Sequence, residues 1–228
     1  MTRSKSRDES KSAGYFPLNL QLEGRSCLVV GGGSVALRKV QNLLDFGGTV
    51  RVVAPDFCSE IEALSARGRV ELVRRAYEPG EAARHDLVIA AVDDRAVNQC
   101  VFDDCRAASV LVNVVDDPER CDFILSGTVR RGPLVISVGT QGTAPFFARW
   151  VREQLEATLP AYWEKVALLA EDFRRRVQSD GTLTFEKKKE LFKRFTDTDW
   201  KELIDDRDGA AAVLERLLSK DGPHDSAP

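Results

Sequence analysis

The sequence predicts an α/β protein whose first half is a parallel sheet with helices on both faces. Short apolar runs alternate with amphipathic stretches from Arg25 onward, beginning with SCLVVG, a helical run over 35–46 and then TVRVVA. This alternation favours parallel strands joined by right-handed crossovers. The pattern changes after Pro118 to two strands with no helix between them, and it becomes helical from Pro145. We therefore expect the sheet to be followed by a small β-hairpin unit and a C-terminal helical domain.

The remaining elements follow from periodicity. The runs VELVRR, DLVIAAV from Asp86 and VLVNVV from Val110 have the length and the β-branched content of buried strands. The segment FILSGTVRRGPLVISVGT, from Phe123, predicts two strands joined by a turn at Arg131, Gly132 and Pro133. Apolar residues at three- and four-residue spacing predict helices over 57–67, 95–107, 146–159, 162–177, 187–195 and 209–218.

Composition divides the chain into five segments. Residues 1–14 and 220–228 are polar and without periodicity, and we expect disordered tails there. The sheet domain is expected over 15–118, the hairpin region over 119–145 and the helical domain over 146–219. A hairpin of two strands cannot bury both of its faces and is marginal in water. We therefore expect the hairpin to pair with a second copy of the chain.

Bulk composition excludes several classes of protein. The 33 basic and 36 acidic residues give a net charge of −3, which gives no reason to expect nucleic-acid binding. No apolar run approaches the roughly 20 residues that span a bilayer, and the N-terminus lacks a signal-peptide core. The five cysteines are odd in number and follow no metal-ligand spacing, which indicates a reducing compartment. We expect a cytoplasmic protein that binds neither nucleic acid nor membrane.

A glycine-rich turn follows the first predicted strand. In CLVVGGGSVALRKV, Gly31, Gly33 and Ala36 form the G-x-G-x-x-A pattern between a strand and a helix, which is typical of a Rossmann domain that binds a dinucleotide. Gly31 permits the tight turn, Gly33 lets the backbone approach a pyrophosphate, and Ala36 keeps the helix close to the sheet. The helix N-terminus then offers unpaired N–H groups to the phosphates. The alternative is a plain strand-to-helix turn, and the correctly placed second strand favours dinucleotide binding.

The end of the second strand bears on the choice of cofactor. Many NAD enzymes carry an acid there that holds the ribose hydroxyls, whereas here the strand ends at Ala54 and the first acid is Asp56. Asp56 would either reach the ribose or cap a helix that begins at Phe57, and both interpretations stay open. No Arg or Lys stands between Val53 and Asp56 to receive a 2′-phosphate, so we expect NAD rather than NADP. The predicted cofactor-binding residues are Gly31, Gly32, Gly33, Ser34, Val35, Ala36, Pro55, Asp56, Ala91, Val92, Asp93, Asn98 and Val115.

Two adjacent carboxylates, Asp116 and Asp117, follow the fifth strand. They stand at the carboxyl edge of the sheet, where ligands of open α/β folds bind. Both would serve as turn residues, since Asp favours turns and the position before Pro118 avoids helix. Near a nicotinamide, one of them would instead act as the general base that hydride transfer from a C–H bond requires. We favour Asp116, because Asp117 directly precedes Pro118 and fits the turn better.

This combination resembles precorrin-2 dehydrogenase, the stand-alone or N-terminal module of siroheme synthase, from Tyr15 to about Leu218. The aromatic-Pro opening of that family corresponds to YFPLNLQLEGR, and its NVVD-x-P motif corresponds to Asn113, Asp116 and Pro118. Other segments that carry the resemblance are GGGSVALRK at 31–39, DDRAVN at 93–98, Phe123 with Ile124, GTAP at 142–145, and Ala148, Arg149, Arg152 and Glu153.

The resemblance implies the oxidation of precorrin-2 to sirohydrochlorin with NAD, in a homodimer that interlocks through the hairpin region. It makes Asp116 the acid/base residue. Some members of the family also insert Fe²⁺ into sirohydrochlorin with the same aspartate, so Fe²⁺ or Co²⁺ is a further expected partner. Related bifunctional enzymes carry a phosphorylatable serine where this chain has Thr140, so phosphorylation is not expected there. We also expect another protein to carry out the methylation that fused enzymes perform.

A tetrapyrrole with many carboxylate arms favours arginine, which matches carboxylates in pairs. Arg120, Arg130, Arg131, Arg149 and Arg152 lie in segments that would surround such a ligand. For Arg130 and Arg131, which flank a turn, solvation is the alternative. No metal site made by the protein is expected, because the two histidines lie before a strand and in a tail. The predicted substrate-binding residues are Asn113, Arg120, Thr140, Gly142, Thr143 and Arg149.

Two other functions stay open at this level. The first is a non-catalytic regulator that senses NAD or another ligand through the Rossmann domain and reaches a partner through the C-terminal helices. It predicts tight NAD binding without oxidation of any porphyrinoid. The second is a chelatase whose dinucleotide site no longer functions, against which the intact Gly31, Gly33 and Ala36 argue.

Overall fold

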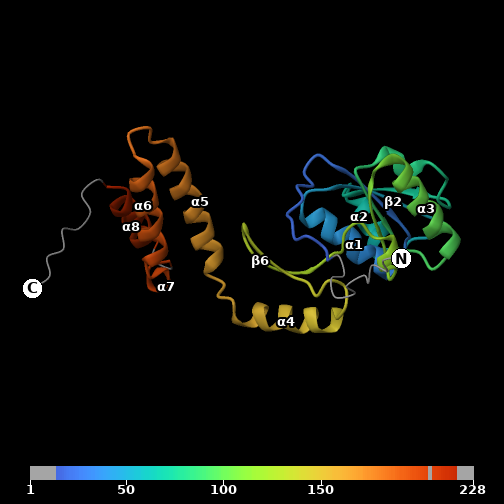
Figure 1. The fold of residues 1–228 in the computed structure, drawn as a ribbon. Helices are drawn as coiled ribbons and strands as arrows, with labels where there is room; N and C mark the ends of the chain where they lie inside the picture. Colours follow the sequence, from blue (N-terminus) through green and yellow to red (C-terminus); the bar gives the residue numbers. More distant parts are fainter. Residues whose placement is uncertain (1–13, 205–206, 220–228) are drawn as a thin grey trace, which may run out of the picture. The chain divides into compact units, whose positions relative to one another are not determined.

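The computed structural model describes residues 14–204 and 207–219 (Figure 1). The chain divides between Leu125 and Ser126 into two compact units, the second of which contains both the hairpin and the helices. The predicted boundaries at 118 and 145 stay predictions of domain organisation. The predicted tail at 220–228, and the predicted N-terminal tail except for residue 14, lie outside the described residues. In the described part of the chain, no helix has the length and apolar character needed to cross a membrane.

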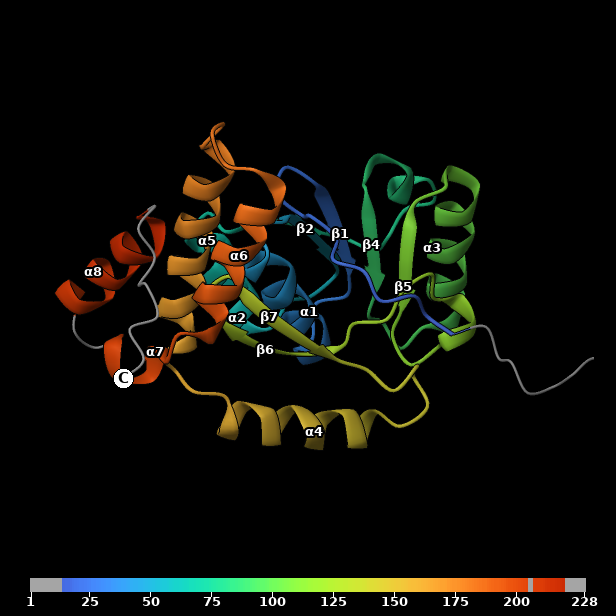
Figure 2. The ribbon, with the colours of Figure 1, turned by 60° about the vertical axis from the view of Figure 1, so that its left-hand side comes forward.

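The first unit is built on a five-stranded parallel sheet. Its strands are β1 (Ser26–Val30), β2 (Thr49–Ala54), β3 (Val70–Arg74), β4 (Leu87–Ala90) and β5 (Leu111–Val114). The spatial order is β3-β2-β1-β4-β5, and every neighbouring pair is parallel. Figure 2 shows β2, β1, β4 and β5 side by side. The predicted α/β fold class is confirmed, because strands buried on both faces produce the nearly continuous apolar runs from which they were predicted.

Helices cover both faces of this sheet. One face packs against α1 (Ser34–Asp45) and α2 (Ser59–Ala66), and the other packs against α3 (Arg95–Ala108) and the 3₁₀ helix η1 (Glu81–Arg84). Each face carries its own set of side chains, because successive side chains along a strand point to opposite faces. A buried core accordingly lies on each side of the sheet. Asp94 is the N-cap of α3, and its carboxylate accepts hydrogen bonds from the backbone N–H groups of Ala96 and Val97.

The second unit begins with an antiparallel hairpin of β6 (Gly127–Arg131) and β7 (Leu134–Val138). Gly132 takes a φ of 57° in the two-residue turn, a conformation that favours glycine. The prediction that the first strand begins at Phe123 is wrong. The Asp122 N–H donates to Val112 O, and the Phe123 carbonyl accepts from the Asn113 amide, so this segment is bound to the first unit's sheet before β6 begins.

Helices complete the second unit. They are α4 (Pro145–Thr158), α5 (Trp163–Ser179), α6 (Phe185–Asp197), α7 (Trp200–Leu203) and α8 (Arg207–Leu218). Phe173 and Phe195 lie at the centre of a core formed by α5, α6, α7 and α8. Helix α7 was not predicted, because four residues are too few to show a period. It is fixed by Trp200, whose indole N–H donates to the Phe195 carbonyl at 2.9 Å.

Candidate active site

The predicted glycine turn joins β1 to α1 at the carboxyl edge of the sheet. Gly31 has a φ of 124°, and a Cβ on it would lie 2.2 Å from the Ala91 carbonyl oxygen. A Cβ on Gly32 would lie 1.9 Å from the carbonyl oxygen of Asp56. Both glycines are therefore required by close approach of the protein's own backbone, at the ends of β4 and β2. The lack of side chains at Gly31 and Gly32 lets the ends of β4 and β2 pack closely against the glycine turn.

Gly33 differs from its two neighbours. A Cβ on Gly33 would meet nothing within 4 Å, and its φ of −86° suits any residue. Gly33 is the N-cap of α1, and no side chain caps this helix. The first N–H groups of a helix have no partner inside it, so those of Ser34, Val35 and Ala36 face an open space beside Gly33. This arrangement fits a pyrophosphate, which a helix N-terminus binds through its N–H groups and partial positive charge.

The end of β4 lies beside the glycine turn. Ala91 and Val92 are half-buried, and Asp93 is exposed. Asn98, on the first turn of α3, donates from its amide to the Val92 carbonyl at 3.0 Å. Its Oδ1 atom is buried and has no partner among the described residues. Buried acceptors are nearly always paired, so Asn98 Oδ1 fits a ligand that carries a donor, such as the carboxamide of a nicotinamide.

Pro55 and Asp56 are exposed after the end of β2. Helix α2 begins at Ser59 with Cys58 as its N-cap, so the alternative in which Asp56 caps a helix from Phe57 is wrong. The Cys58 N–H donates instead to the Gly32 carbonyl, which pulls this loop onto the glycine turn. Contact of Asp56 with a ribose stays a prediction.

Asp116 lies in the turn after β5 and takes a left-handed conformation, with a φ of 60°. Asp is one of the few residues other than glycine that tolerate this region. The Val115 N–H donates to Ala90 O and the Asp117 N–H donates to Val114 O, so the backbone is held on both sides. The Asp116 side chain is exposed. Its carboxylate makes no hydrogen bond or ion pair with any described residue.

Asp117, in contrast, is engaged. Arg120 donates to its carboxylate at 2.5 Å and to the Gln99 side chain at 2.8 Å. Asp117 also precedes the 3₁₀ helix η2 (Pro118–Arg120), as its predicted turn role requires. The donors of Arg120 are thus partly occupied inside the first unit, and its contact with substrate stays a prediction.

A buried pair holds the loop around Asp116. The Asn113 side chain is 6% exposed, and its amide donates to the Phe123 carbonyl at 2.9 Å and to Cys121 Sγ at 3.3 Å. The Cys121 thiol lies 3.2 Å from the carbonyl oxygens of both Val114 and Asp117. Burial raises the pKa of Cys121, so the thiol keeps its proton and remains a donor. Asn113 thus has a structural position, and its predicted contact with substrate stays a prediction.

Asp116 has one charged neighbour, Lys39, that no sequence motif predicted. Lys39, on the second turn of α1, is half-buried, and burial followed by the charge of Arg38 lowers its pKa. The charge of Asp116 acts in the opposite direction and raises it. An ammonium group therefore faces the Asp116 loop. The spacing in the sequence could have placed Lys39, since it follows Ala36 by three residues and so lies on the same side of the helix.

Four predicted substrate-binding residues lie in the second unit. The Thr140 carbonyl accepts from the Thr143 hydroxyl at 2.6 Å, and the Thr140 hydroxyl accepts from the Ala144 N–H at 3.1 Å. Gly142 takes a φ of 77° in this turn, which leads directly into α4. Arg149 pairs with Glu153 on α4, and its side chain is 79% exposed. Its guanidinium group is thus accessible within this unit.

Arg131 is not the solvated turn residue that its position suggested. Its side chain is 16% exposed, and its guanidinium donates to the Glu156 carboxylate at 2.7 Å. It also donates to the carbonyl oxygens of Glu156 and Leu159, at the end of α4. Cations stabilise this end of a helix. Arg131 therefore fastens the hairpin to α4, which indicates a structural role.

We expect Arg131→Met to destabilise the second unit by about 2 kcal/mol, the typical value of hydrogen bonds to a charged group. Arg130→Met is the matched control, because Arg130 is exposed and its bond to the Gly132 carbonyl is local to the turn. The control should change stability by less than about 0.5 kcal/mol. Urea unfolding of the full chain, followed by circular dichroism, measures both. Equal losses in the two variants would contradict the assignment.

Taken together, the doubly wound sheet, the glycine turn and the open helix N-terminus define a domain that binds a nicotinamide dinucleotide. Residues 18–127 match the family described as putative NAD(P)-binding. A siroheme synthase from Pseudomonas putida F1 is 46% identical over 72% of this chain and 36% of its own length. One from Thioalkalivibrio sulfidiphilus is 38% identical over 90% of this chain and 42% of its own. The chain is thus similar to siroheme synthases over most of its own length, and it spans about two fifths of these relatives.

A solved structure adds support for the fold alone. The protein described as SirC, precorrin-2 dehydrogenase, is 22% identical to this chain, with a TM-score of 0.71. The match covers 90% of this chain and 99% of that one. A parallel sheet followed by a hairpin and C-terminal helices is therefore shared with that protein.

Proposed function

We propose that this chain is a precorrin-2 dehydrogenase that oxidises precorrin-2 to sirohydrochlorin with NAD as the hydride acceptor. The observation that carries the proposal is the free carboxylate of Asp116, held at the carboxyl edge of the same sheet as the glycine turn. Similarity to siroheme synthases supports the choice of substrate. The name of the structurally similar SirC agrees with it.

The reaction removes two electrons and two hydrogens from the tetrapyrrole. Bound NAD⁺ would accept one hydrogen as a hydride from a ring carbon. Asp116 would take the other as a proton and pass it to water, so that the products are sirohydrochlorin, NADH and H⁺. Because the Asp116 carboxylate is exposed and without a partner in the described residues, it is available as a base.

The choice of NAD over NADP belongs to this proposal. Pro55 and Asp56 follow β2 and are exposed, and neither offers positive charge to a 2′-phosphate. Asp56 would bind the ribose hydroxyls. Substrate carboxylates would be bound by Arg120 and Arg149, together with the turn at Thr140, Gly142 and Thr143.

A homodimer is also proposed. Phe146 and Trp150, four residues apart on α4, are 78% and 54% exposed, and Phe147 stacks on Trp150. Aromatic side chains gathered in this way mark interaction surfaces. A two-stranded hairpin also needs a partner for its open face. A second copy of this chain would cover both features.

We expect the Phe146→Glu, Trp150→Glu double variant to elute and scatter as a monomer where the parent chain is a dimer. Two buried carboxylates without partners would outweigh the area that such an interface buries. Phe185→Glu is the control, since Phe185 is 79% exposed on α6, outside this face. Light scattering behind a sizing column measures the mass. A double variant that stays dimeric, as the control does, would refute the proposed interface.

Iron or cobalt insertion into sirohydrochlorin is a further proposed activity, with Fe²⁺ or Co²⁺ as a substrate and Asp116 as the base that removes pyrrole protons. No group of three or more metal-ligating side chains lies together in the part that the structure describes. The incoming ion would therefore meet the tetrapyrrole nitrogens and a single carboxylate. We also propose a cytoplasmic location, which the five free thiols support.

The proposal is tested by incubating the full chain anaerobically with precorrin-2, generated in place, and NAD or NADP, while following the absorbance of sirohydrochlorin. We expect formation of sirohydrochlorin that depends on NAD. Addition of Fe²⁺ or Co²⁺, with a protein-free control, tests insertion. NAD binding without any change in the tetrapyrrole spectrum would overturn the dehydrogenase proposal and favour the sensing regulator. Insertion without NAD dependence would favour a chelatase.

A further inference from the structure

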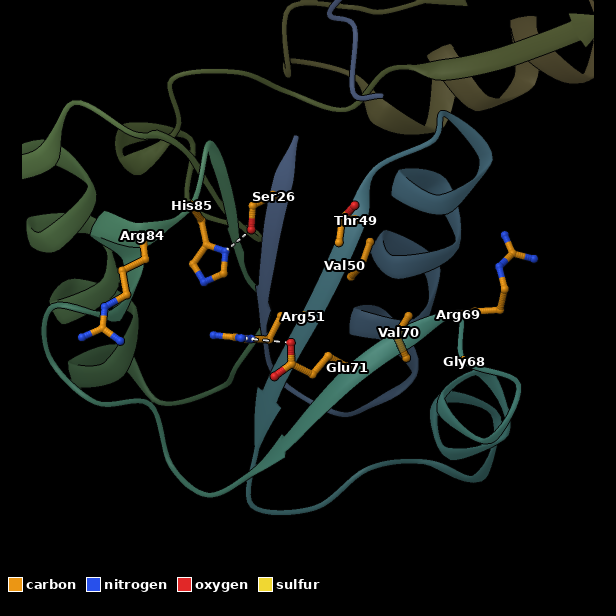
Figure 3. A pocket seen from close by; sticks show the side chains of 10 residues that line it. All are labelled: Ser26, Thr49, Val50, Arg51, Gly68, Arg69, Val70, Glu71, Arg84 and His85. Atoms are coloured by element: carbon orange, nitrogen blue, oxygen red, sulfur yellow. Dashed lines mark hydrogen bonds and ion pairs between the residues drawn. The ribbon is translucent and has the colours of Figure 1, made fainter. Parts of the chain in front are cut away.

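A second polar site lies in the first unit, at the opposite ends of the strands from the glycine turn. The amino-terminal parts of β1, β2 and β3 border a pocket of about 690 Å³ (Figure 3). Arg51, Glu71 and His85 line it, together with Ser26, Arg69 and Arg84. Neither the predicted cofactor-binding residues nor Asp116 takes part in it. The pocket therefore needs its own explanation.

The pocket exists because one face of the sheet is incompletely covered. Leu28, Arg51 and Glu71 are register neighbours on β1, β2 and β3, so their side chains share the face on which α3 lies. Helix α3 packs over β4 and β5. In the described chain, no helix covers β2 and β3 on this side. Arg51 and Glu71 consequently form an ion pair at 2.9 Å where a covered sheet would carry apolar side chains.

Positive charge exceeds negative charge in the pocket. Glu71 satisfies one nitrogen of Arg51, whereas Arg51 Nε is buried and has no partner in the described part of the chain. The side chains of Arg84 and Arg69 are exposed and make no hydrogen bond or ion pair with a described residue. Glu81 lies close to Arg51, but its carboxylate already forms an ion pair with Arg75 at 2.6 Å. The pocket therefore carries donors and positive charge that the protein does not satisfy.

His85 adds a directed donor. Its side chain is 9% exposed, and its Nδ1 lies 2.7 Å from the Ser26 hydroxyl. Burial lowers the pKa of His85, and the charge of Arg51 lowers it further, so the ring is neutral at pH 7. We assign the Ser26 hydroxyl as the donor to Nδ1, which places the proton of the ring on Nε2. In Figure 3 the His85 ring and the Arg51 guanidinium extend toward the same space.

We propose that this pocket binds a small multivalent anion, bearing phosphate or carboxylate groups, between Arg51, Arg84 and His85. Guanidinium groups bind such oxygens in pairs through charge-assisted hydrogen bonds. The neutral imidazole contributes a further donor. Arg69 lies at the opposite side of the pocket and points away from the other two arginines (Figure 3), so it is not part of the contact set.

The two histidines of the chain make a direct test possible. The full chain, labelled with ¹⁵N, is titrated at constant ionic strength with inorganic phosphate and, separately, with citrate, while the imidazole resonances of His85 and His224 are followed by NMR. We expect a saturable shift of His85 with no matching shift of His224. Phosphate and citrate arms identify which oxyanion the site prefers.

Arg84→Gln should weaken binding at least tenfold, roughly the loss of one hydrogen bond to a charged group. Arg67→Gln is the control, because Arg67 is exposed at the end of α2, outside the pocket. Arg51→Gln tests the second arginine, with circular dichroism confirming its fold. A His85 shift that stays linear with both anions, or equal affinity in Arg84→Gln and Arg67→Gln, would overturn the proposal. Because NAD and the tetrapyrrole are absent, this test is independent of the dehydrogenase assay.

Discussion

Replacement of Asp116 by Asn should reduce the rate of precorrin-2 oxidation by about 10²- to 10⁴-fold, the usual contribution of a positioned general base. The backbone should not change, because Asn tolerates the left-handed conformation that Asp116 adopts, with its φ of 60°. NAD affinity should also stay the same, because the phosphates of NAD are expected to bind at the glycine turn and not at Asp116. Stopped-flow absorbance of sirohydrochlorin measures the rate, and fluorescence titration measures NAD binding.

Asp117→Asn is the matched control for this experiment. It removes a carboxylate one residue away, whose partly exposed ion pair with Arg120 is worth at most about 1 kcal/mol. We expect turnover within a few-fold of the parent. A reversal of the two results would assign the base to Asp117 and would show that its pairing with Arg120 opens when substrate binds. Full activity in both variants would leave no carboxylate base in this turn.

The second large effect is expected at Gly33. A Cβ there meets no atom within 4 Å, and the backbone conformation suits alanine, so Gly33→Ala should change stability by less than about 0.5 kcal/mol. The new methyl group would occupy the space in front of the N–H groups that open α1. Loss of one or two charge-assisted bonds to a phosphate should weaken NAD binding roughly 100-fold, equivalent to about 2.7 kcal/mol.

Alanine variants of two further glycines are compared with Gly33→Ala. Gly181→Ala is the control, because a Cβ on Gly181 also meets nothing within 4 Å but lies in the second unit, and it should leave NAD binding unchanged. Gly32→Ala should unfold the first unit, since its Cβ would lie 1.9 Å from a backbone oxygen. Thermal unfolding and isothermal titration calorimetry separate the two kinds of effect. Tight NAD binding by Gly33→Ala would exclude the turn as the phosphate site.

The fold was predictable where local sequence carries the signal. Runs such as SCLVVG and DLVIAAV match β1 and β4 because both faces of those strands are buried. The start of the hairpin was misplaced because Phe123 is apolar for a different reason, namely packing in the core of the first unit. Arg131 was misjudged because its partners on α4 lie 25 and 28 residues further along the chain. No local pattern records such contacts.

The same distinction applies to the site. The glycine turn and the acidic turn after β5 were predictable, since each lies within a short motif. The left-handed conformation of Asp116, and the support of its loop by Asn113 and Cys121, depend on atoms brought together by folding. The Arg51–Glu71 pair was only weakly indicated by the sequence, where each of the two charged residues interrupts a largely apolar strand. Only the register of β2 and β3 shows that those charges face each other.

The glycine turn also limits which substitutions related sequences could accept during evolution. Gly31 and Gly32 are held by contact with the strand ends, so a descendant that no longer used a dinucleotide would still need both in order to fold. Gly33 is free of that constraint. Among relatives, a change at Gly33 alone would therefore be the first visible mark of a lost cofactor.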